Sequence, residues 1–344
     1  MRRSMFFLPL LLPAVLSACT GTTEDAVTIR LAVLSGTGSA AALSTVDVGK
    51  TGVQQTASVP NAVDLATLPG GNKLALLYTD HLETRDANLA NPVSQPNPTD
   101  AAFRPCYVKL EVSAALDRLA ALSDCGNGAL QQVVVWRSDG SVSFSATLPA
   151  PTPSTPRQTR LAVQGDTVWA VHPAVGSGSE LLRVSRNSDG SSSLASPVSV
   201  PTINDLAFFK GALYAAVSSG VQTLSSSGTL TALPATTQLN TPASNLYSSD
   251  RLLGAWQSGS SAPLLIWNGS KTGIPAYFSD LRDVTYAPDA TLYSLDATTL
   301  TQFDSAYGLA GNGWRNTPLA TFNNPRAVTW LVPIAAPVSP PAQP

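Results

Sequence analysis

The stretch Ala62-Val63-Asp64-Leu65-Ala66 recurs as Ile203-Asn204-Asp205-Leu206-Ala207 and as Leu281-Arg282-Asp283-Val284-Thr285, each time with an aspartate inside a short apolar run. Weaker copies of this opening begin at Val108, Thr159 and Ala243. A turn rich in Gly, Asp or Asn follows each opening, and a second apolar run comes after the turn. Short runs joined by such turns predict antiparallel hairpins, and their spacing of roughly 40 to 50 residues predicts a repeated β unit.

Each unit continues with a third strand and usually with a fourth. Third strands are predicted at residues 132–136, 180–185, 220–224, 263–267 and 300–303. Fourth strands are shorter and stop before Pro149, Pro201 and Pro234, since a residue without an N–H cannot continue a hydrogen-bonded ladder. Four-stranded units at this period resemble the blades of β-propellers, and the resemblance extends over residues 27–333. We therefore expect an all-β fold.

Two incomplete units remain at the ends of this region. The ranges 28–35, 41–48 and 53–59 have the pattern of a second, a third and an outer strand, whereas 327–332 has that of a lone inner strand. Pairing the two fragments makes a seventh blade and removes an exposed sheet edge, so we predict a ring of seven four-stranded blades closed by its own ends. Residues 83–105 hold four prolines and little strand pattern, and we predict a long loop there.

The N-terminal residues have the composition of an export signal. Arg2 and Arg3 precede an apolar stretch, Met5 to Val15, that is too short to span a bilayer. The sequence Leu16-Ser17-Ala18-Cys19 resembles the lipobox of bacterial lipoproteins. This resemblance implies that residues 1–18 are a signal peptide and that Cys19 carries fatty acyl chains such as palmitate. Two or more acyl chains hold a protein stably on a membrane.

The same resemblance predicts an organisation and a location. We expect residues 19–26 to be a lipidated tether, 27–333 the propeller and 334–344 a disordered Pro-rich tail. The anchor would hold the protein in the cell envelope, on a periplasmic or outer face. Thr20 in place of Asp favours the outer membrane, by analogy with one lipoprotein sorting rule. Loss of residues 1–18 moves the formal charge from −2 to about −4, a weak charge that predicts no nucleic-acid partner.

Only Cys106 and Cys125 remain after Cys19. An exported protein folds in an oxidising compartment, so we predict that these two cysteines form a disulfide. The alternative is a pair of buried free thiols. A metal site is disfavoured, because two cysteines and the distant His81 and His172 do not have the spacing of metal ligands.

Asp64, Asp205 and Asp283 occupy one position of the repeat, and Asn245 occupies it in another unit. Equivalent positions of a ring meet at one end of its axis, where carboxylate and amide oxygens could bind Ca²⁺. Gluconolactonase-like propellers hold a metal in this way, so the resemblance permits a lactonase or esterase. The favoured alternative is structural, with each aspartate capping a turn by accepting backbone N–H bonds. Lys109, Arg160 and Ala327 take the same place in the remaining units.

Signals of catalysis are sparse. His81 and His172 are the only histidines, and the chain has neither a nucleophile elbow nor a phosphate-binding Gly loop. We expect a non-catalytic, lipid-anchored envelope propeller that needs no cofactor and binds a protein, peptide or glycan through a face of the ring or the 83–105 loop. A calcium-dependent hydrolase and a purely structural envelope protein are the alternatives.

Overall fold

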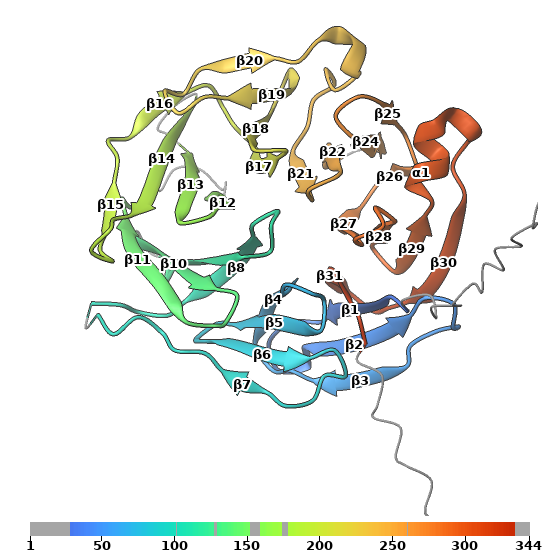
Figure 1. Cartoon of the computed structure of the whole chain (residues 1–344), viewed down its shortest axis with the longest axis horizontal. Coiled ribbons are helices and arrows are strands. Elements are labelled where there is room, and N and C mark those ends of the chain that lie inside the picture. Colours follow the sequence, from blue (N-terminus) through green and yellow to red (C-terminus); the bar gives the residue numbers. More distant parts are fainter. Residues whose placement is uncertain are drawn as a thin grey trace, which may run out of the picture.

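A computed structural model describes residues 28–333, apart from residues 101, 127–128, 152–158, 174–177 and 260. Seven antiparallel sheets stand in a ring around a central axis (Figure 1), and the fold is a seven-bladed β-propeller. The prediction from the sequence repeat is therefore confirmed. The signal peptide and tether expected at residues 1–26, and the tail expected at 334–344, lie outside the described residues.

Each blade has four positions, from an inner strand at the axis to an outer strand at the rim. Blade 1 contains β31 (Pro325–Leu331), β1 (Arg30–Ser35), β2 (Ala42–Asp47) and β3 (Gln55–Ser58). Blade 2 contains β4 (Ala62–Thr67), β5 (Lys73–Tyr78), β6 (Leu82–Asp86) and β7 (Val93–Ser94). Blade 3 contains β8 (Tyr107–Val112), β9 (Arg118–Ser123), β10 (Gln131–Arg137) and β11 (Val142–Leu148).

The second half of the ring follows the same order. Blade 4 contains β12 (Arg160–Gln164), β13 (Thr167–Pro173), β14 (Ser179–Arg186) and an outer position shared by β15 (Ser192–Leu194) and β16 (Val198–Val200). Blade 5 contains β17 (Asp205–Phe209), β18 (Ala212–Val217), β19 (Gly220–Leu224) and β20 (Leu230–Ala232). Blade 6 contains β21 (Asn245–Ser248), β22 (Leu253–Trp256), β24 (Leu265–Trp267) and β25 (Thr272–Gly273). Blade 7 contains β27 (Leu281–Tyr286), β28 (Leu292–Asp296), β29 (Thr299–Phe303) and β30 (Asn316–Thr321).

The two ends of the described chain close the ring, as the two sequence fragments predict. Strand β1 pairs antiparallel with β31, with Arg30 opposite Leu331 and Leu34 opposite Ala327. Residue 28 and residue 333 therefore leave the ring at the same end of its axis. We call this the terminal face and the other end the opposite face.

Apolar packing between neighbouring blades holds the ring together. In β1, Leu31 and Val33 join a cluster with blade 7, whereas Ala32 and Leu34 join a cluster with blade 2. Seven such clusters fill the seven blade interfaces. Because successive side chains of a strand point to opposite faces, a strand buried on both faces needs apolar residues at every position. This is why the strands appear in the sequence as unbroken apolar runs.

The prediction of a loop over residues 83–105 is wrong in its first part. Leu82–Asp86 forms β6 and pairs with β5, although its Leu-Glu-Thr-Arg-Asp sequence lacks an apolar run. Its polar side chains are tolerated because they pair locally, as Arg85 does with Glu83 at 2.5 Å. Val93–Ser94 forms β7, the outer strand of blade 2, so this part of the loop prediction is wrong as well. After β7 the segment reaches blade 3, where Trp136 donates to the carbonyl of Pro96 at 2.9 Å.

Blades 6 and 7 carry further departures from the regular pattern. The predicted strand 263–267 is split, since β23 (Ala262–Pro263) leaves blade 6 to pair with β26 (Tyr277–Phe278). A short helical insert, α1 (Ser305–Tyr307) and η3 (Gly308–Asn312), separates β29 from β30. Within the ranges described, no helix has the length and apolar character needed to cross a membrane.

The predicted disulfide is present. Cys106 lies just before β8 and Cys125 lies just after β9, and their Cα atoms are 5.0 Å apart. The bond fixes the exit of the 95–105 segment to the second strand of blade 3. Both cysteines lie on the opposite face, away from the two ends of the described chain.

Candidate axial binding site

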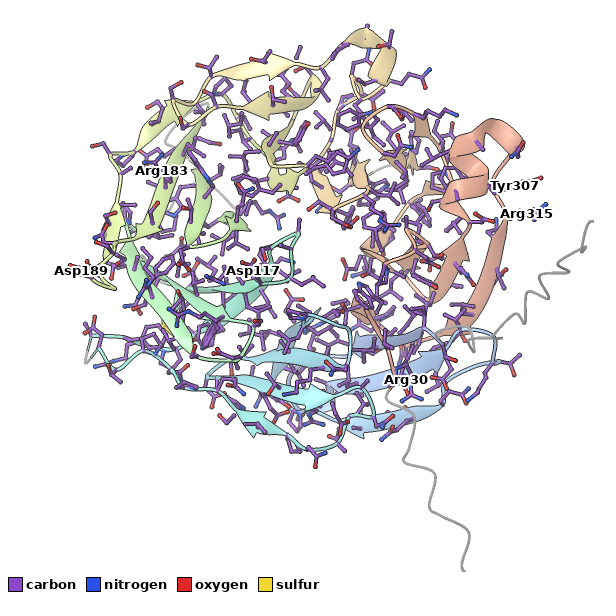
Figure 2. All side chains as sticks on the ribbon, in the orientation of Figure 1. Arg30, Asp117, Arg183, Asp189, Tyr307 and Arg315 are labelled. Atoms are coloured by element: carbon purple, nitrogen blue, oxygen red, sulfur yellow. A yellow bond between two sulfur atoms is a disulfide. The ribbon has the colours of Figure 1, made fainter. Side chains whose placement is uncertain are left out.

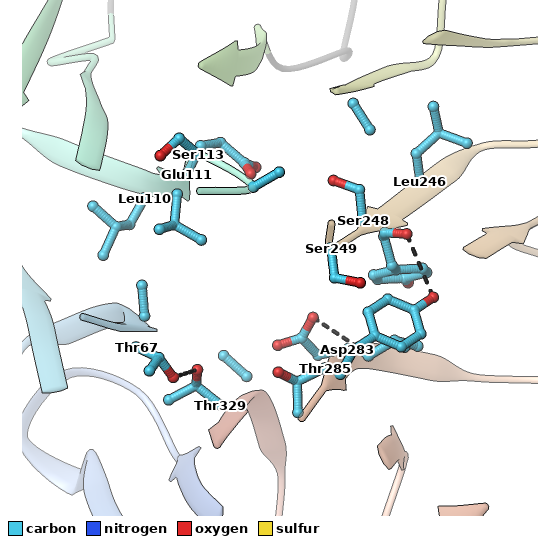
Figure 3. Close-up of a pocket in the computed structure, with 18 of the residues that line it drawn as sticks. Thr67, Leu110, Glu111, Ser113, Leu246, Ser248, Ser249, Asp283, Thr285 and Thr329 are labelled. Atoms are coloured by element: carbon cyan, nitrogen blue, oxygen red, sulfur yellow. Dashed lines mark hydrogen bonds between the residues drawn. The ribbon is translucent and has the colours of Figure 1, made fainter. Parts of the chain in front are cut away.

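A pocket of about 680 Å³ runs along the axis of the ring (Figure 3). Its walls are the inner strands of the blades and the loops that follow these strands on the terminal face. The structure brings all four residues of the predicted calcium site, Asp64, Asp205, Asn245 and Asp283, into this one pocket. They lie at its end near the opposite face, where the inner strands begin.

Each of the three aspartates joins its own blade to the next one. One carboxylate oxygen accepts a hydrogen bond from the following backbone N–H, at 2.9 Å for Asp64, 3.0 Å for Asp205 and 2.8 Å for Asp283. The second oxygen accepts from an inner-strand N–H of the next blade: Leu110 for Asp64 at 3.0 Å, Leu246 for Asp205 at 2.9 Å and Val328 for Asp283 at 2.8 Å. These N–H groups lie on sheet edges that no further strand covers.

The favoured structural role is thus present in the geometry, but its detail differs from the prediction. The aspartates do not cap the preceding turn, because one of their two backbone partners comes from another blade. The matching positions of other blades hold Lys109, Arg160, Asn245 and Ala327. Arg326, next to Ala327, fastens blade 1 to blade 2 by donating to the carbonyl of Ala62 at 3.2 Å and to that of Val63.

The electrostatics of the pocket follow from the burial of its charges. Desolvation raises the pKa of Asp283 to about 7 and, opposed in part by Lys109, the pKa of Glu111 to about 7. Burial also raises the pKa of Asp205. The Asp64 carboxylate, with Nζ of Lys109 at 3.4 Å, raises the pKa of that lysine. The charge of this pocket therefore changes near neutral pH.

The calcium hypothesis stays a prediction. Among the described residues, no three His, Cys, Asp or Glu side chains are grouped so that they could share a metal ion. Each of the three aspartates already uses both oxygens for backbone N–H groups. Any Ca²⁺ would have to share these oxygens or displace the bonds that join the blades.

The two histidines lie in other parts of the molecule. His81 stacks on Tyr78, with ring centroids 4.4 Å apart, and its Nδ1 is 2.7 Å from the carboxylate of Asp80. His172 lies in β13 and is buried, and neither ring nitrogen has a hydrogen-bond partner in the described part of the chain. Burial lowers the pKa of His172 to about 4, and the charge of Asp124 opposes this shift.

Sequence reasoning missed several polar residues of the pocket. Glu111 projects from β8, and Ser248 and Ser249 lie across the pocket from it (Figure 3). Tyr247 and Thr285 complete this set. Glu111 could have been found as the residue two positions after Lys109, since alternate residues of a strand share a face. The hydroxyl side chains carry no such signal, because Ser and Thr are abundant throughout the chain.

Comparison with known proteins supports the fold but assigns no function to the chain. No protein-family model matches the sequence, and no curated protein does so. The structure of apo AztD from Citrobacter koseri has a TM-score of 0.53 at 10% identity, over 89% of this chain and 98% of that one. A putative 6-phosphogluconolactonase from Bacteroides uniformis has a TM-score of 0.59 at 13% identity, over 89% and 100%. The β-propeller domain of the Trilobed protease from Pyrococcus furiosus, described as an open velcro topology, has a TM-score of 0.54 at 11% identity, over 85% and 94%.

Proposed function

We propose that this protein is a lipoprotein of the cell envelope, anchored through Cys19, whose propeller binds a partner. The observation that carries the proposal is the position of the chain ends relative to the lipobox. Residue 28 lies on the terminal face and follows Cys19 by nine residues. Nine residues span about 30 Å at most when fully extended, so an acylated Cys19 keeps the terminal face close to the membrane.

This orientation leaves the opposite face pointing away from the membrane. That face carries the disulfide and the segment that leads into it from blade 2. It also carries two of the most exposed large apolar side chains, Leu130 at 62% and Tyr277 at 65%. Aromatic and aliphatic side chains of this kind are common anchors in protein interfaces. We assign partner binding to the opposite face and the binding of smaller ligands to the axial pocket.

The anchoring is tested by fractionation and lipid labelling. Cys19→Ala should abolish incorporation of labelled fatty acid and move the protein from the membrane fraction to the soluble fraction. Thr20→Ser is the matched control and should behave as the wild type. A Cys19→Ala protein that still sediments with membranes would refute the anchor.

The binding face is tested by site-specific photocrosslinking in intact cells. A crosslinker in place of Leu130 or Tyr277 should capture a discrete partner. The same group at Asp139 or Ser227, in exposed turns of the terminal face, should not capture it. Capture only from the terminal-face positions would overturn the assignment of faces.

The hydrolase alternative has its own test. A calcium site at Asp64, Asp205, Asn245 and Asp283 predicts that Ca²⁺ raises the melting temperature, because a ligand at 100 times its dissociation constant stabilises a protein by about 2.7 kcal/mol. A saturable Ca²⁺ shift together with ester or lactone hydrolysis would favour that alternative over the binding function.

A further inference from the structure

Ten charged residues line the axial pocket, five basic and five acidic: Lys109, Arg160, Arg251, Arg282, Arg326, Asp64, Glu111, Asp205, Asp250 and Asp283. Most of them have protein partners. Arg282 pairs with Asp280 at 2.7 Å, and Arg251 lies 3.9 Å from Asp250. The three inner aspartates and Arg326 are engaged with backbone groups of neighbouring blades. The three aspartates and Arg326 hold the ring together, whereas Arg251 and Arg282 lie beside acidic residues of their own blades.

Arg160 differs from the other cations of the pocket. Its side chain is half-buried, and it forms no hydrogen bond or ion pair with any residue that the structure describes. A guanidinium has five donors in a planar fork that matches a carboxylate. Asp205 and Glu111 act on this guanidinium through space but form no hydrogen bond or ion pair with it. Its donors are therefore open to an anion from outside the chain, and such an anion would offset the cost of its partial burial.

Two further charged groups lie on the neighbouring blade. Lys109 and Glu111, both in β8, have their ammonium and carboxyl groups 3.5 Å apart. Their side chains are 40% and 33% exposed, so both reach the solvent inside the pocket. No backbone donor binds the carboxyl of Glu111 in the described ranges. A ligand can therefore reach all three side chains.

Hydroxyl groups supply the other side of the pocket. The side-chain hydroxyls of Tyr247, Ser248 and Thr285 line it and have no hydrogen-bond partner among the described residues. Figure 3 shows Ser248 and Thr285 facing the pocket from blades 6 and 7. Free hydroxyls both donate and accept, which matches the hydroxyls of a sugar.

We propose that the axial pocket binds a hydroxylated carboxylate, a sugar acid, with Arg160 paired to its carboxylate. This inference rests on the binding role proposed above. Lys109 adds a second positive charge, while Tyr247, Ser248 and Thr285 bind the sugar hydroxyls. The pocket volume of about 680 Å³ is within the range of small-molecule sites.

The affinity of the pocket for this ligand depends on whether the carboxyl of Glu111 is protonated. Burial raises its pKa to about 7, and the charged groups that act on it are Lys109 on its own strand, Asp64 on β4, Arg160 on β12 and Asp205 on β17. The neutral carboxyl donates a hydrogen bond to an anionic ligand, whereas the ionised form repels it. The ligand therefore binds with uptake of a proton and more tightly below pH 7.

The test is calorimetric titration of the full-length protein in detergent with sodium glucuronate. Glucuronate should bind, whereas glucose, which lacks the carboxylate, and acetate, which lacks the hydroxyls, should bind at least tenfold more weakly. Arg160→Gln should weaken glucuronate binding at least tenfold. Arg183→Gln is the matched control, because Arg183 belongs to the same blade but lies far from the axis, over the ring of Trp169 (Figure 2).

A second variant keeps the test decisive if Arg160→Gln fails to fold. In the wild type, affinity should fall about tenfold from pH 6 to pH 8, as a group with a pKa near 7 loses its proton. Glu111→Gln should reduce this pH dependence, and Asp283, whose pKa is also raised to about 7 in the same pocket, should account for what remains. Tighter binding of a galacturonate trimer than of galacturonate would identify a polysaccharide as the source of the ligand, and the reverse order would identify a free sugar acid.

Three results would overturn the inference: no binding of either uronate, binding that Arg160→Gln leaves unchanged, or preference for glucosamine over glucuronate. A Cys19→Ala protein that still sediments with membranes would refute the proposed anchor but would leave this titration unaffected. The two proposals can therefore fail separately.

Discussion

The carboxylate of Asp283 accepts a hydrogen bond from the backbone N–H of Val328 at 2.8 Å, and so joins blade 7 to the strand that closes the ring. Asp64 and Asp205 make the same bond to Leu110 and Leu246. Each bond satisfies an inner-strand N–H that would otherwise be left on the wall of a narrow pocket. The repeated aspartate of the sequence is therefore a device for joining blades.

Removal of one such bond should destabilise the protein. Asp205→Ala leaves two buried backbone N–H groups without an acceptor and should lower the free energy of unfolding by about 2 to 4 kcal/mol. Asn245→Ala is the matched control, since Asn245 takes the same position in blade 6 but its side chain has no hydrogen bond among the described residues. Its effect should stay within about 0.5 kcal/mol. Denaturant unfolding at pH 7 measures both, and equal effects would refute the joining role.

Most strands of this fold could be predicted from the sequence, because each blade interface requires apolar side chains on both faces of its strands. The two terminal fragments could be matched because residues 28–59 lack only the inner strand of a blade and residues 327–332 have the pattern of an inner strand alone. Strand β6 could not be predicted in this way. Its Glu83, Thr84 and Arg85 are polar and find their partners within the blade, so the strand has no apolar pattern.

The site could be predicted only in outline. Convergence of Asp64, Asp205 and Asp283 follows from the repeat alone, but their partners on the next blade depend on the register between separate sheets. Whether Arg160 has a hydrogen-bonding partner depends on the residues that the fold places around it. The sequence alone does not reveal which arginine of a ring is left without a hydrogen bond or an ion pair among the described residues.

His172 should make the protein sensitive to acid. Its pKa is about 4 in the folded protein and 6.5 as the ordinary value of an unfolded chain. Between these values the unfolded state binds a proton that the folded state does not. The contribution of neutral His172 to the free energy of unfolding is therefore fully present above pH 6.5 and is lost as the pH falls to 4. The loss should total about 3 kcal/mol.

Substitution of His172 separates this effect from opposing ones. Glu111 and Asp283 have raised pKa values and give a slope of the opposite sign over the same pH range, so the comparison is between variant and wild type. His172→Phe should remove the acid-dependent loss, whereas His81→Gln, at the chain's other histidine, should keep it. Urea unfolding at pH 4.5 and pH 7 measures the difference. Equal pH dependence in His172→Phe and the wild type would contradict the assignment.

The disulfide should stabilise the protein without being needed to form the ring. Cys106 and Cys125 close a loop with a sequence separation of 19 residues, for which restriction of the unfolded chain gives about 3 kcal/mol. The double variant Cys106→Ser/Cys125→Ser should lose this amount of unfolding free energy. Its circular dichroism should stay that of a β-propeller, because the adjoining ladder, including the bond from Asp124 N–H to the carbonyl of Cys106, remains.

A reducing agent provides the control for the disulfide. It should lower the stability of the wild type to that of the double variant and leave the variant unchanged. A wild type that is unaffected while fully reduced, as judged by thiol titration, would show that the bond contributes nothing to stability.

The contact that seals the ring can be tested at two neighbouring glycines. Gly70 and Gly71 have φ values of 78° and 72°, so an alanine would introduce similar backbone strain at either position. A Cβ at Gly70 would meet nothing closer than 3.8 Å, whereas one at Gly71 would collide with the side chains of Trp330 and Val332. Gly71→Ala should therefore cost about 1 to 3 kcal/mol more than Gly70→Ala.

The difference between the two glycine variants reports on the closure itself, because Trp330 belongs to the last strand and Gly71 to the turn after β4. The carbonyl of Gly71 also accepts a hydrogen bond from the N–H of Val332 at 2.7 Å, so a displaced turn loses a second link between the chain ends and blade 2. Hydrogen exchange should show faster exchange in β1 and β31 for Gly71→Ala and no change for Gly70→Ala. If both variants unfold at the same denaturant concentration, the packing of Trp330 on this turn does not hold the ring closed.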